Sequence, residues 1–239
     1  MMAEELLLRP VAYARNGFTD KFGIPRQVEN DTVLRTRIVF VPECRSEEAL
    51  RGLEGFTHLW LLWGFHGNQK SEVRNQKLTV RPPRLGGNVR MGVFATRSPY
   101  RPNPIGLTSV RLVGIERTAK DGTALVVEGA DMLDGTPIYD IKPYLRYCDS
   151  HPEAEDGFVQ TTPRTMLSVV WPDSLPDNCP KSEIEEILRG DPRPAYQQDE
   201  QRVYGMDYGG WNVQFRVREN AAEVLSVCKM QKTARKNAK

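Results

Sequence analysis

Short runs rich in β-branched and aromatic residues recur along this chain, and their close spacing limits the folds that it can adopt. The five runs in the first half occupy residues 33–41, 58–65, 91–96, 107–115 and 124–128. Each has the length and composition typical of a β-strand. Glycine-containing turn sequences precede two of them, LGGN at 85–88 and KDG at 120–122. Many short strands separated by tight turns favour a β-barrel.

Helical patterns are scarce. Ser46 is expected to cap a helix over 47–54, and Ser182 a helix over 183–189, because glutamates follow each serine in the first turn. Neither segment is long enough to organise the fold. The sequence therefore predicts a mainly β protein.

A change of composition at residues 149–164 predicts a domain boundary. This stretch is polar and acidic, contains prolines and has no periodic apolar face, as expected of a linker. We expect a barrel domain over 1–150 and a small α+β domain with a basic tail over 165–239. The second domain is expected to contain an apolar run at 166–171, the short helix, a loop at 190–202, and strands at 211–217 and 223–228.

Positive charge is concentrated in one part of the chain. The net charge is only +2, yet the interval between Glu72 and Glu116 contains no acid. Its eight cations are Arg74, Lys77, Arg81, Arg84, Arg90, Arg97, Arg101 and Arg111. Such a stretch is either a solvated surface or a surface that binds phosphates, and the charge alone leaves both open.

Other features exclude whole classes of protein. No stretch approaches the roughly 18 apolar residues that span a bilayer, and the first residues do not resemble a secretory leader. The four cysteines lie far apart without CxxC spacing, which argues against a zinc site and a disulfide framework. We therefore expect a cytoplasmic protein with reduced thiols, no metal and no contact with membranes.

Residues 81–106 are the most unusual segment. Prolines stiffen the loop, and Gly92 and Gly106 permit close approach of backbone to a ligand. Arg97 and Arg101 lie in the rigid part, where a fixed guanidinium suits a carboxylate or a phosphate. The segment is interpreted as a preorganised pocket wall; the alternative is a stiff connection between strands.

A second dense segment, 131–144, places three aspartates near Lys142 around a turn at Gly135. The aspartates are Asp131, Asp134 and Asp140. A carboxylate here would accept from ribose hydroxyls or assist removal of a proton from an attacking nitrogen. The alternative is a tight hairpin in which Asp134 bonds its own turn.

Long ungapped motifs carry a family resemblance. They are KFGIPRQ (21–27), RGLEGFTHLWLLWGFH (51–66), TVRPPRLGGNVRMGVFATRSPYRPNPIG (79–106), DMLDGTPIYDIKPY (131–144) and DPRPAY (191–196). These runs closely resemble the TrmO family, also called TsaA-like proteins, which are tRNA (adenine-N6)-methyltransferases. The resemblance covers nearly all of the first 150 residues and recurs through the C-terminal part.

The resemblance implies a β-barrel of non-Rossmann type that binds S-adenosylmethionine, followed by a small domain, in an active homodimer. It implies methylation of a threonylcarbamoylated adenosine at position 37, beside the anticodon of tRNA. The absence of a GxGxxG motif after any expected strand agrees with a non-Rossmann site. The implied cofactor contacts are Pro25, Arg26, Gln27, His66, Gly67, Arg97, Leu107, Leu133, Asp134, Gly135 and Thr136.

The substrate chemistry adds further candidates. Asp140 or Asp134 is the expected base, since an adenine N6 that bears a carbonyl is a poor nucleophile until its proton is hydrogen-bonded or removed. Lys142 and Arg193 are candidates to bind the threonyl carboxylate, and Tyr196 to stack on a base of the anticodon loop. The full set of expected substrate contacts is Arg84, Arg101, Lys142, Tyr144, Arg193 and Tyr196.

Two alternatives stay open at this point. One is a non-catalytic barrel whose arginine-rich segment tracks RNA phosphates. The other is a methyltransferase that uses the same pocket for a small molecule. Binding of the cofactor would separate the first from an enzyme, and the tRNA product would separate the second.

Overall fold

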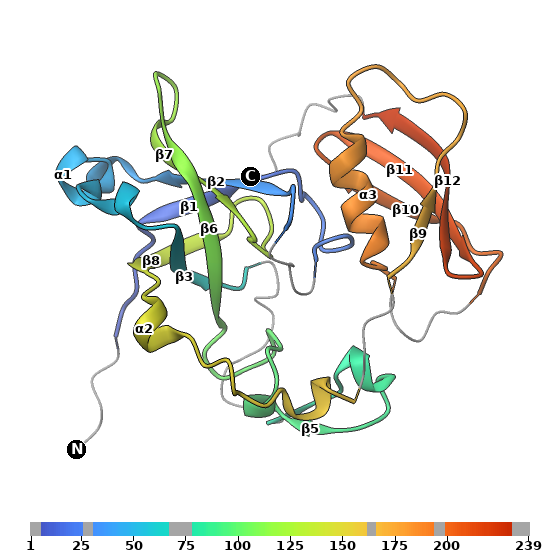
Figure 1. The fold of residues 1–239 in the computed structure, drawn as a ribbon, viewed down its shortest axis with the longest axis horizontal. Helices are drawn as coiled ribbons and strands as arrows, with labels where there is room; N and C mark the ends of the chain where they lie inside the picture. Colours follow the sequence, from blue (N-terminus) through green and yellow to red (C-terminus); the bar gives the residue numbers. More distant parts are fainter. Residues whose placement is uncertain (1–5, 26–30, 67–77, 162–165, 194–198, 231–239) are drawn as a thin grey trace, which may run out of the picture.

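A six-stranded antiparallel sheet that closes on itself forms the first half of the protein. The computed structural model describes residues 6–25, 31–66, 78–161, 166–193 and 199–230. The strands pair in the order β1-β2-β7-β6-β3-β8, and β8 pairs back to β1 (Figure 1). Their bounds are β1 Ala12–Arg15, β2 Arg35–Phe40, β3 His58–Gly64, β6 Ile105–Thr118, β7 Gly122–Glu128 and β8 Pro137–Pro143. The mainly β class expected from the sequence is confirmed.

The interior of this barrel takes alternate residues from its strands. Along β3 the side chains of Leu59, Leu61 and Trp63 are buried, although the sequence HLWLLW has no polar alternation. The outward Trp60 is half-buried, and its indole N–H donates to Asp149 Oδ2 at 2.9 Å. Packing inside the barrel therefore sets which face of β3 points inward.

The strands only partly follow the expected runs. Four of the five expected strands appear as β2, β3, β6 and β7. The run at 91–96 was wrong as a strand: only Met91–Gly92 is extended, as β5, and a 3₁₀ helix follows over Val93–Ala95. β1 and β8 were not expected, and β8 occupies the second half of the segment at 131–144.

Short helices and a two-stranded sheet complete the first part. They are β4 Thr79–Val80 paired with β5, α1 Glu47–Leu50, α2 Arg146–Asp149, and the 3₁₀ helices Pro42–Cys44, Leu53–Gly55, Pro83–Leu85, Val93–Ala95 and Gly157–Val159. The Ser46 cap is confirmed, since its hydroxyl accepts from the Ala49 N–H at 3.2 Å. The helix is shorter than expected and ends at Leu50.

A separate four-stranded sheet, called the second sheet below, forms the C-terminal part. Its order is β10-β11-β12-β9, with β9 parallel to β12 and the other pairs antiparallel. The strands are β9 Ser168–Val170, β10 Tyr204–Tyr208, β11 Trp211–Arg218 and β12 Ala221–Lys229. Glu219 and Asn220 both have positive φ, 46° and 64°, as a type I′ hairpin between β11 and β12 requires.

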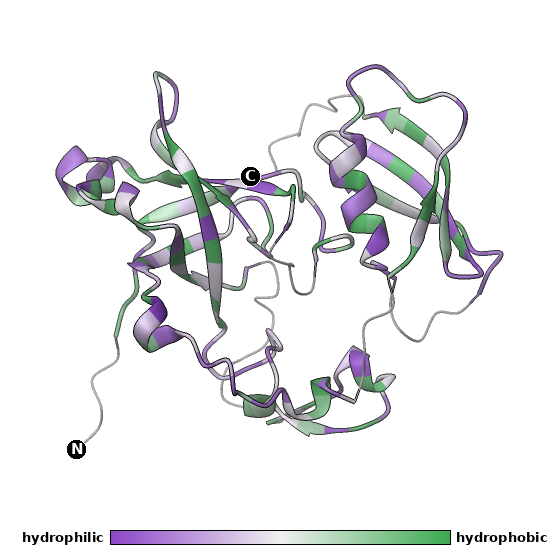
Figure 2. Ribbon diagram, viewed as in Figure 1, coloured by the Kyte–Doolittle hydropathy of each residue, from purple (hydrophilic) through white to green (hydrophobic). Residues whose placement is uncertain are grey.

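The helix α3, Lys181–Arg189, covers one face of the second sheet (Figure 1). It buries Ile184, Ile187 and Leu188, and hydrophobic and hydrophilic residues alternate along the strands (Figure 2). The expected Ser182 cap is wrong, because the helix begins two residues earlier, after Pro180, and no side chain caps it.

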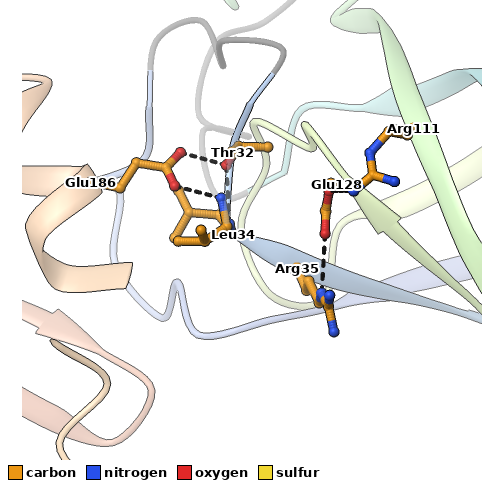
Figure 3. A network of polar contacts seen from close by, with 7 residues as sticks. Thr32, Leu34, Arg35, Arg111, Glu128 and Glu186 are labelled. Atoms are coloured by element: carbon orange, nitrogen blue, oxygen red, sulfur yellow. Dashed lines mark hydrogen bonds and ion pairs between the residues drawn. The ribbon is translucent and has the colours of Figure 1, made fainter. Parts of the chain in front are cut away.

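Two hydrophobic cores result, one inside the barrel and one between α3 and the second sheet. Phe18 and Leu34 belong to the second core although they flank β1 and β2 in the first part of the chain. Glu186 of α3 accepts hydrogen bonds from the Thr32 hydroxyl and from the Val33 N–H, the latter at 2.7 Å (Figure 3). These contacts attach α3 to the segment that leads into β2.

No helix in the part of the chain that the structure describes is long and apolar enough to cross a membrane.

Candidate functional site

The strand register brings four chain segments together at one end of the barrel, called the site end below. Gly64 at the end of β3 pairs with Ile105 at the start of β6, and Trp63 pairs with Ile138 near the start of β8. β1 joins them, since Tyr13 pairs with Pro137. Segments that leave or enter these strands here must therefore lie near one another.

The turn Leu133–Thr136 lies at the site end and is held by backbone hydrogen bonds. Gly135 has a φ of 81°, the left-handed conformation that a type II turn requires at its third residue. The Thr136 N–H donates to the Leu133 carbonyl at 3.2 Å, and the Gly135 N–H donates to the Ala14 carbonyl at 2.9 Å. The turn is thus fixed to β1 before any ligand binds.

His66 packs against this turn, and the family resemblance implies that both contact the cofactor. Its Nδ1 lies 3.1 Å from the hydroxyl of Thr136, which is only 1 % exposed. The space above Gly135 is bounded by His66 and Arg15: an added Cβ would lie 3.9 Å from His66 Nε2 and 3.5 Å from an Arg15 guanidinium nitrogen. Glycine therefore keeps the backbone of the turn accessible beside the imidazole.

The carboxylate of Asp134 is oriented but partly exposed. It accepts from the Asn16 N–H at 3.2 Å and lies 3.9 Å from Arg15 Nη1, with 37 % of the side chain exposed. A carboxylate has more acceptor positions than these contacts occupy. Asp134 can therefore accept from a ligand that carries hydroxyl groups.

A partly buried carboxylate at the site end was not among the predicted site residues. Asp131 accepts from the Thr108 hydroxyl at 2.7 Å, and Thr108 accepts from the Trp63 indole N–H at 3.0 Å. Burial raises the pKa of Asp131, while the hydrogen bond from Thr108 and the positive charge of Arg97 oppose that rise. The predicted Arg97 is therefore close enough to Asp131 to act on its charge.

Residues 81–106, called the arginine-rich segment below, and the strand β6 that follows them contribute other predicted residues. Arg101 is folded back on its own loop, where Nη1 donates to the Thr96 carbonyl at 3.0 Å. Arg84 lies in the 3₁₀ helix Pro83–Leu85. Leu107 lies on β6 next to Thr108 and is 56 % exposed, which leaves it available for contact with a ligand or a partner.

The remaining predicted residues of the barrel lie on β8 or directly after it, at increasing distance from the turn. Asp140 and Lys142 form an ion pair with 2.9 Å between Oδ2 and Nζ. Both lie farther along β8 from the turn than Ile138, which pairs with Trp63 at the site end. Tyr144 follows the far end of β8, where its ring packs against Trp60, a strand's length of about 20 Å from the turn. Within one chain, Tyr144 is therefore not brought together with His66 and the turn.

Arg193 lies in the C-terminal part, and its side chain is largely buried. Its guanidinium donates to both carboxylate oxygens of Asp191, each at 2.9 Å, and only 15 % of the side chain is exposed. The hydrogen bond with Asp191 raises the pKa of Arg193 and exceeds the opposing effect of burial. Any anion that binds Arg193 must therefore share it with Asp191.

Four predicted residues lie outside the described residues: Arg26, Gln27, Gly67 and Tyr196. Pro25 is half-buried and follows Ile24, which packs against the second core. Asn16 was not predicted, because a single asparagine belongs to no sequence motif or periodic pattern that would mark it. Its amide donates to the Met132 carbonyl at 2.9 Å and so supports the segment before the turn. Asp131 was visible in the aspartate-rich segment, but the sequence gave no sign that its carboxylate would be partly buried and bound to Thr108.

A cavity of about 660 Å³ lies elsewhere, between the region of α1 and the second half of β6. Its lining includes Leu50, Glu54, Phe56, Leu112 and Arg117. It is at the opposite end of β6 from Thr108, so it is not the candidate site. Among the residues that the structure describes, no group of three or more His, Cys, Asp or Glu side chains is arranged to hold a metal ion.

Comparisons with known proteins agree along most of the chain. Residues 13–150 match the family described as the tRNA-methyltransferase O N-terminal domain, and residues 167–230 match the TrmO C-terminal domain. A tRNA (adenine(37)-N6)-methyltransferase of Escherichia coli is 37% identical over 228 residues, which cover 91% of this chain and 95% of that protein.

Pseudomonas aeruginosa provides a similar sequence and a similar structure. A putative S-adenosylmethionine-dependent methyltransferase is 42% identical over 208 residues, covering 82% of this chain and 86% of that protein. A crystal structure of TrmO superposes with a TM-score of 0.75 at 31% identity. The match covers 94% of this chain and 100% of that chain.

Proposed function

Because the chain belongs to the TrmO family, we propose that it transfers a methyl group from S-adenosylmethionine to N6 of the adenosine at position 37 of tRNA. The observation that carries this proposal is the cluster of His66 and the turn Leu133–Thr136 at the site end, beside Arg97 and Asp131. Within this activity, the preferred substrate is adenosine whose N6 already bears a threonylcarbamoyl group.

The residues at the site end fit the polar groups of S-adenosylmethionine. Asp134 offers acceptor oxygens for ribose hydroxyls, and its orientation by Asn16 lowers the entropy lost on binding. Arg97 offers a guanidinium for the carboxylate of the methionine part. The exposed side chain of Leu107 offers apolar contact for the adenine.

S-adenosylmethionine supplies an electrophilic methyl group and leaves as a neutral thioether. The protein therefore needs to align donor and acceptor and to handle one proton, and alignment supplies much of the rate. The acceptor nitrogen is conjugated with a carbonyl, so its proton must be hydrogen-bonded or removed. Asp134 and Asp140 are the proposed bases.

The ion pair of Asp140 with Lys142 links the proposed base to substrate recognition. Lys142 is 71% exposed in its side chain and lies within 2.9 Å of Asp140. A threonyl carboxylate that binds Lys142 competes with Asp140 for the ammonium group. Substrate binding would then release the Asp140 carboxylate to accept a proton. Arg84, Arg101, Tyr144, Arg193 and Tyr196 are the other proposed substrate contacts.

We further expect a homodimer in the cytoplasm. Phe94 and Tyr100 are 75 % and 60 % exposed on the arginine-rich segment, and large exposed aromatic side chains are typical of interfaces. The four cysteines are free, which suits a reducing compartment. The two domains proposed from the sequence, 1–150 and 165–239, carry one core each, with Phe18 and Leu34 crossing to the second.

The activity is tested with purified protein, S-adenosylmethionine and two tRNAs that differ only in the threonylcarbamoyl group at adenosine 37. Mass spectrometry of the digested nucleosides should detect one added methyl group on the modified adenosine and none on the unmodified one. Methylation of both tRNAs would refute the preference for the modified base. A protein that binds tRNA but not S-adenosylmethionine would instead be an RNA-binding module.

The cofactor role of Arg97 is tested with two variants from the same segment. We expect Arg97→Ala to weaken S-adenosylmethionine binding by about 1.5–3 kcal/mol, as for the loss of a charged hydrogen bond. Arg90→Ala is the matched control, because Arg90 is an exposed arginine of the same acid-free interval. Isothermal titration calorimetry measures both, and equal affinities would remove Arg97 from the donor site.

A further inference from the structure

Residues 16–25, called the linking segment below, run from the end of β1 at the site end to the second sheet. They leave β1 directly after Arg15, and Phe18, Phe22 and Ile24 pack into or against the second core. The segment therefore contacts the candidate site with one end and a different core with the other.

The first residues of the linking segment hold the backbone of the turn. The Phe18 carbonyl accepts from the Asp134 N–H at 2.8 Å, and the Asn16 N–H donates to the Asp134 carboxylate at 3.2 Å. The Asn16 side chain also donates to the Met132 carbonyl at 2.9 Å. The position of Asp134 thus depends on two residues that follow β1.

The same residues are fixed to the second sheet. The Phe18 ring is 2 % exposed and meets Tyr208 edge-on, with 5.0 Å between ring centroids. The Gly17 carbonyl accepts from the Gly209 N–H at 2.9 Å. No side chain fits at Gly17, because an added Cβ would lie 2.6 Å from the Tyr208 ring and 2.9 Å from the Gly209 nitrogen.

Contacts farther along the segment extend this attachment. Gly23 has a φ of +100°, and an added Cβ there would lie 2.9 Å from the sulfur of Met206 on β10. The Phe22 ring stacks on Tyr204 of the same strand, with 6.3 Å between centroids. Beyond the segment, Glu186 binds Thr32 and Val33 (Figure 3). The second sheet contacts the chain before Pro25, and α3, which covers that sheet, contacts it after Pro25.

We propose that the second sheet positions the donor site: through Gly17 and Phe18 it holds the Asp134 turn in the conformation that binds S-adenosylmethionine. This inference rests on the proposed function. Phe18 and Tyr208 are positioning residues, since they act on the donor through the backbone of the turn. Affinity for the donor is then a property of both cores, although the proposed contacts lie on the barrel.

The first test truncates the anchor and measures donor affinity. Phe18→Ala should raise the Kd for S-adenosylmethionine about tenfold, the size of effect that residues remote from a ligand can exert. Phe18→Leu should restore most of the affinity, because it refills the core. The turnover rate at saturating donor should change much less than the KM for the donor.

The matched control is Val217→Ala. Val217 is a 3 % exposed residue of the same core, at the far end of β11 from Trp211, which pairs with Tyr208. It should lower the melting temperature without changing donor affinity, when both variants are compared well below their melting temperatures. An unchanged Kd in Phe18→Ala, or an equal rise in Val217→Ala, would overturn the proposal.

A second test uses the unaltered protein and so does not depend on the folding of a variant. Saturation with S-adenosylmethionine should slow hydrogen–deuterium exchange of the Gly209 amide and of β10 as well as of the turn. Protection confined to the barrel would contradict the proposal while leaving the proposed function intact. Failure of the unaltered protein to bind the donor at all would instead refute the proposed function.

Discussion

At the scale of one residue, Asp131 is a carboxyl group whose charged form is disfavoured by its surroundings in the fold. Burial raises its pKa from the ordinary value of 3.8. One hydrogen bond from Thr108 and the nearby charge of Arg97 offset only part of that effect. In the folded state the carboxyl group therefore binds its proton more strongly than in the unfolded chain.

This shift predicts how stability depends on pH. Between 3.8 and the raised pKa, the folded state binds more protons than the unfolded state, so stability falls as the pH rises through that window. Asp131→Asn keeps an acceptor for Thr108 and removes this loss. The melting temperature of the variant relative to the unaltered protein should therefore increase from about pH 4 to about pH 7. Parallel curves from thermal denaturation would show that Asp131 does not titrate abnormally.

At this scale, sequence reasoning named residues that the structure places close together. His66, the turn at Gly135 and Arg97 were assigned through the family resemblance, and the structure brings His66 to the turn. It could not identify Asn16, whose importance comes from three backbone and side-chain contacts made across the barrel. Such contacts depend on register between distant strands, which leaves no local pattern.

At the scale of elements, the contact between β3 and β6 depends on a glycine, which has no side chain. Gly106 pairs with Trp63, and a Cβ added there would lie 2.2 Å from the indole ring. The tryptophan is therefore packed directly against the backbone of β6, with its N–H on Thr108. This packing closes the barrel at the site end.

Two substitutions on the same strand test this packing. Gly106→Ala should destabilise the protein by about 1–3 kcal/mol, since an overpacked core must shift side chains or backbone. Gly114→Ala is the matched control, because nothing lies within 4 Å of an added Cβ there. Chemical denaturation measures both. A Gly106→Ala protein as stable as the control would mean that Trp63 can move aside at no cost.

The expected and observed strands differ where local pattern and tertiary context disagree. The β-branched runs of β2 and β7 were sufficient to predict strands, and the pairing of β2 with β7 places them side by side. The run at 91–96 has the same composition but turns into a 3₁₀ helix after two residues of pairing with β4. β8 begins with a proline and contains Asp140 and Lys142, so its strand character comes from pairing with both β1 and β3.

At the scale of the whole molecule, Glu186 joins α3 to the segment that leads into β2 of the barrel. Its carboxylate accepts from Thr32 and Val33, and Thr32 is 7 % exposed (Figure 3). The neighbouring network of Glu128 with Arg35 and Arg111 stays within the barrel, where Glu128 is 4 % exposed. Only the first of these two acidic groups bridges separate parts of the fold.

Replacing Glu186 with glutamine should loosen that connection. An amide has one acceptor oxygen in place of two, so one donor among Thr32 and Val33 is left without its partner, at a cost of about 1–3 kcal/mol. Glu185→Gln is the control, because its contact with the Trp171 indole N–H needs a single acceptor. Calorimetry should resolve two melting transitions in Glu186→Gln. A single transition at the original temperature would show that the apolar contacts suffice.

The parallel pairing of β9 with β12 has a consequence for how the protein is made. β9 is the first strand of the second sheet in the sequence and lies at its edge, yet its hydrogen-bonding partner is the last strand. On the ribosome, the barrel strands emerge complete while Phe18 still lacks the core that receives it. On the proposal that the second sheet positions the Asp134 turn, a nascent chain therefore reaches its full affinity for the donor only after residues 221–229 have left the exit tunnel.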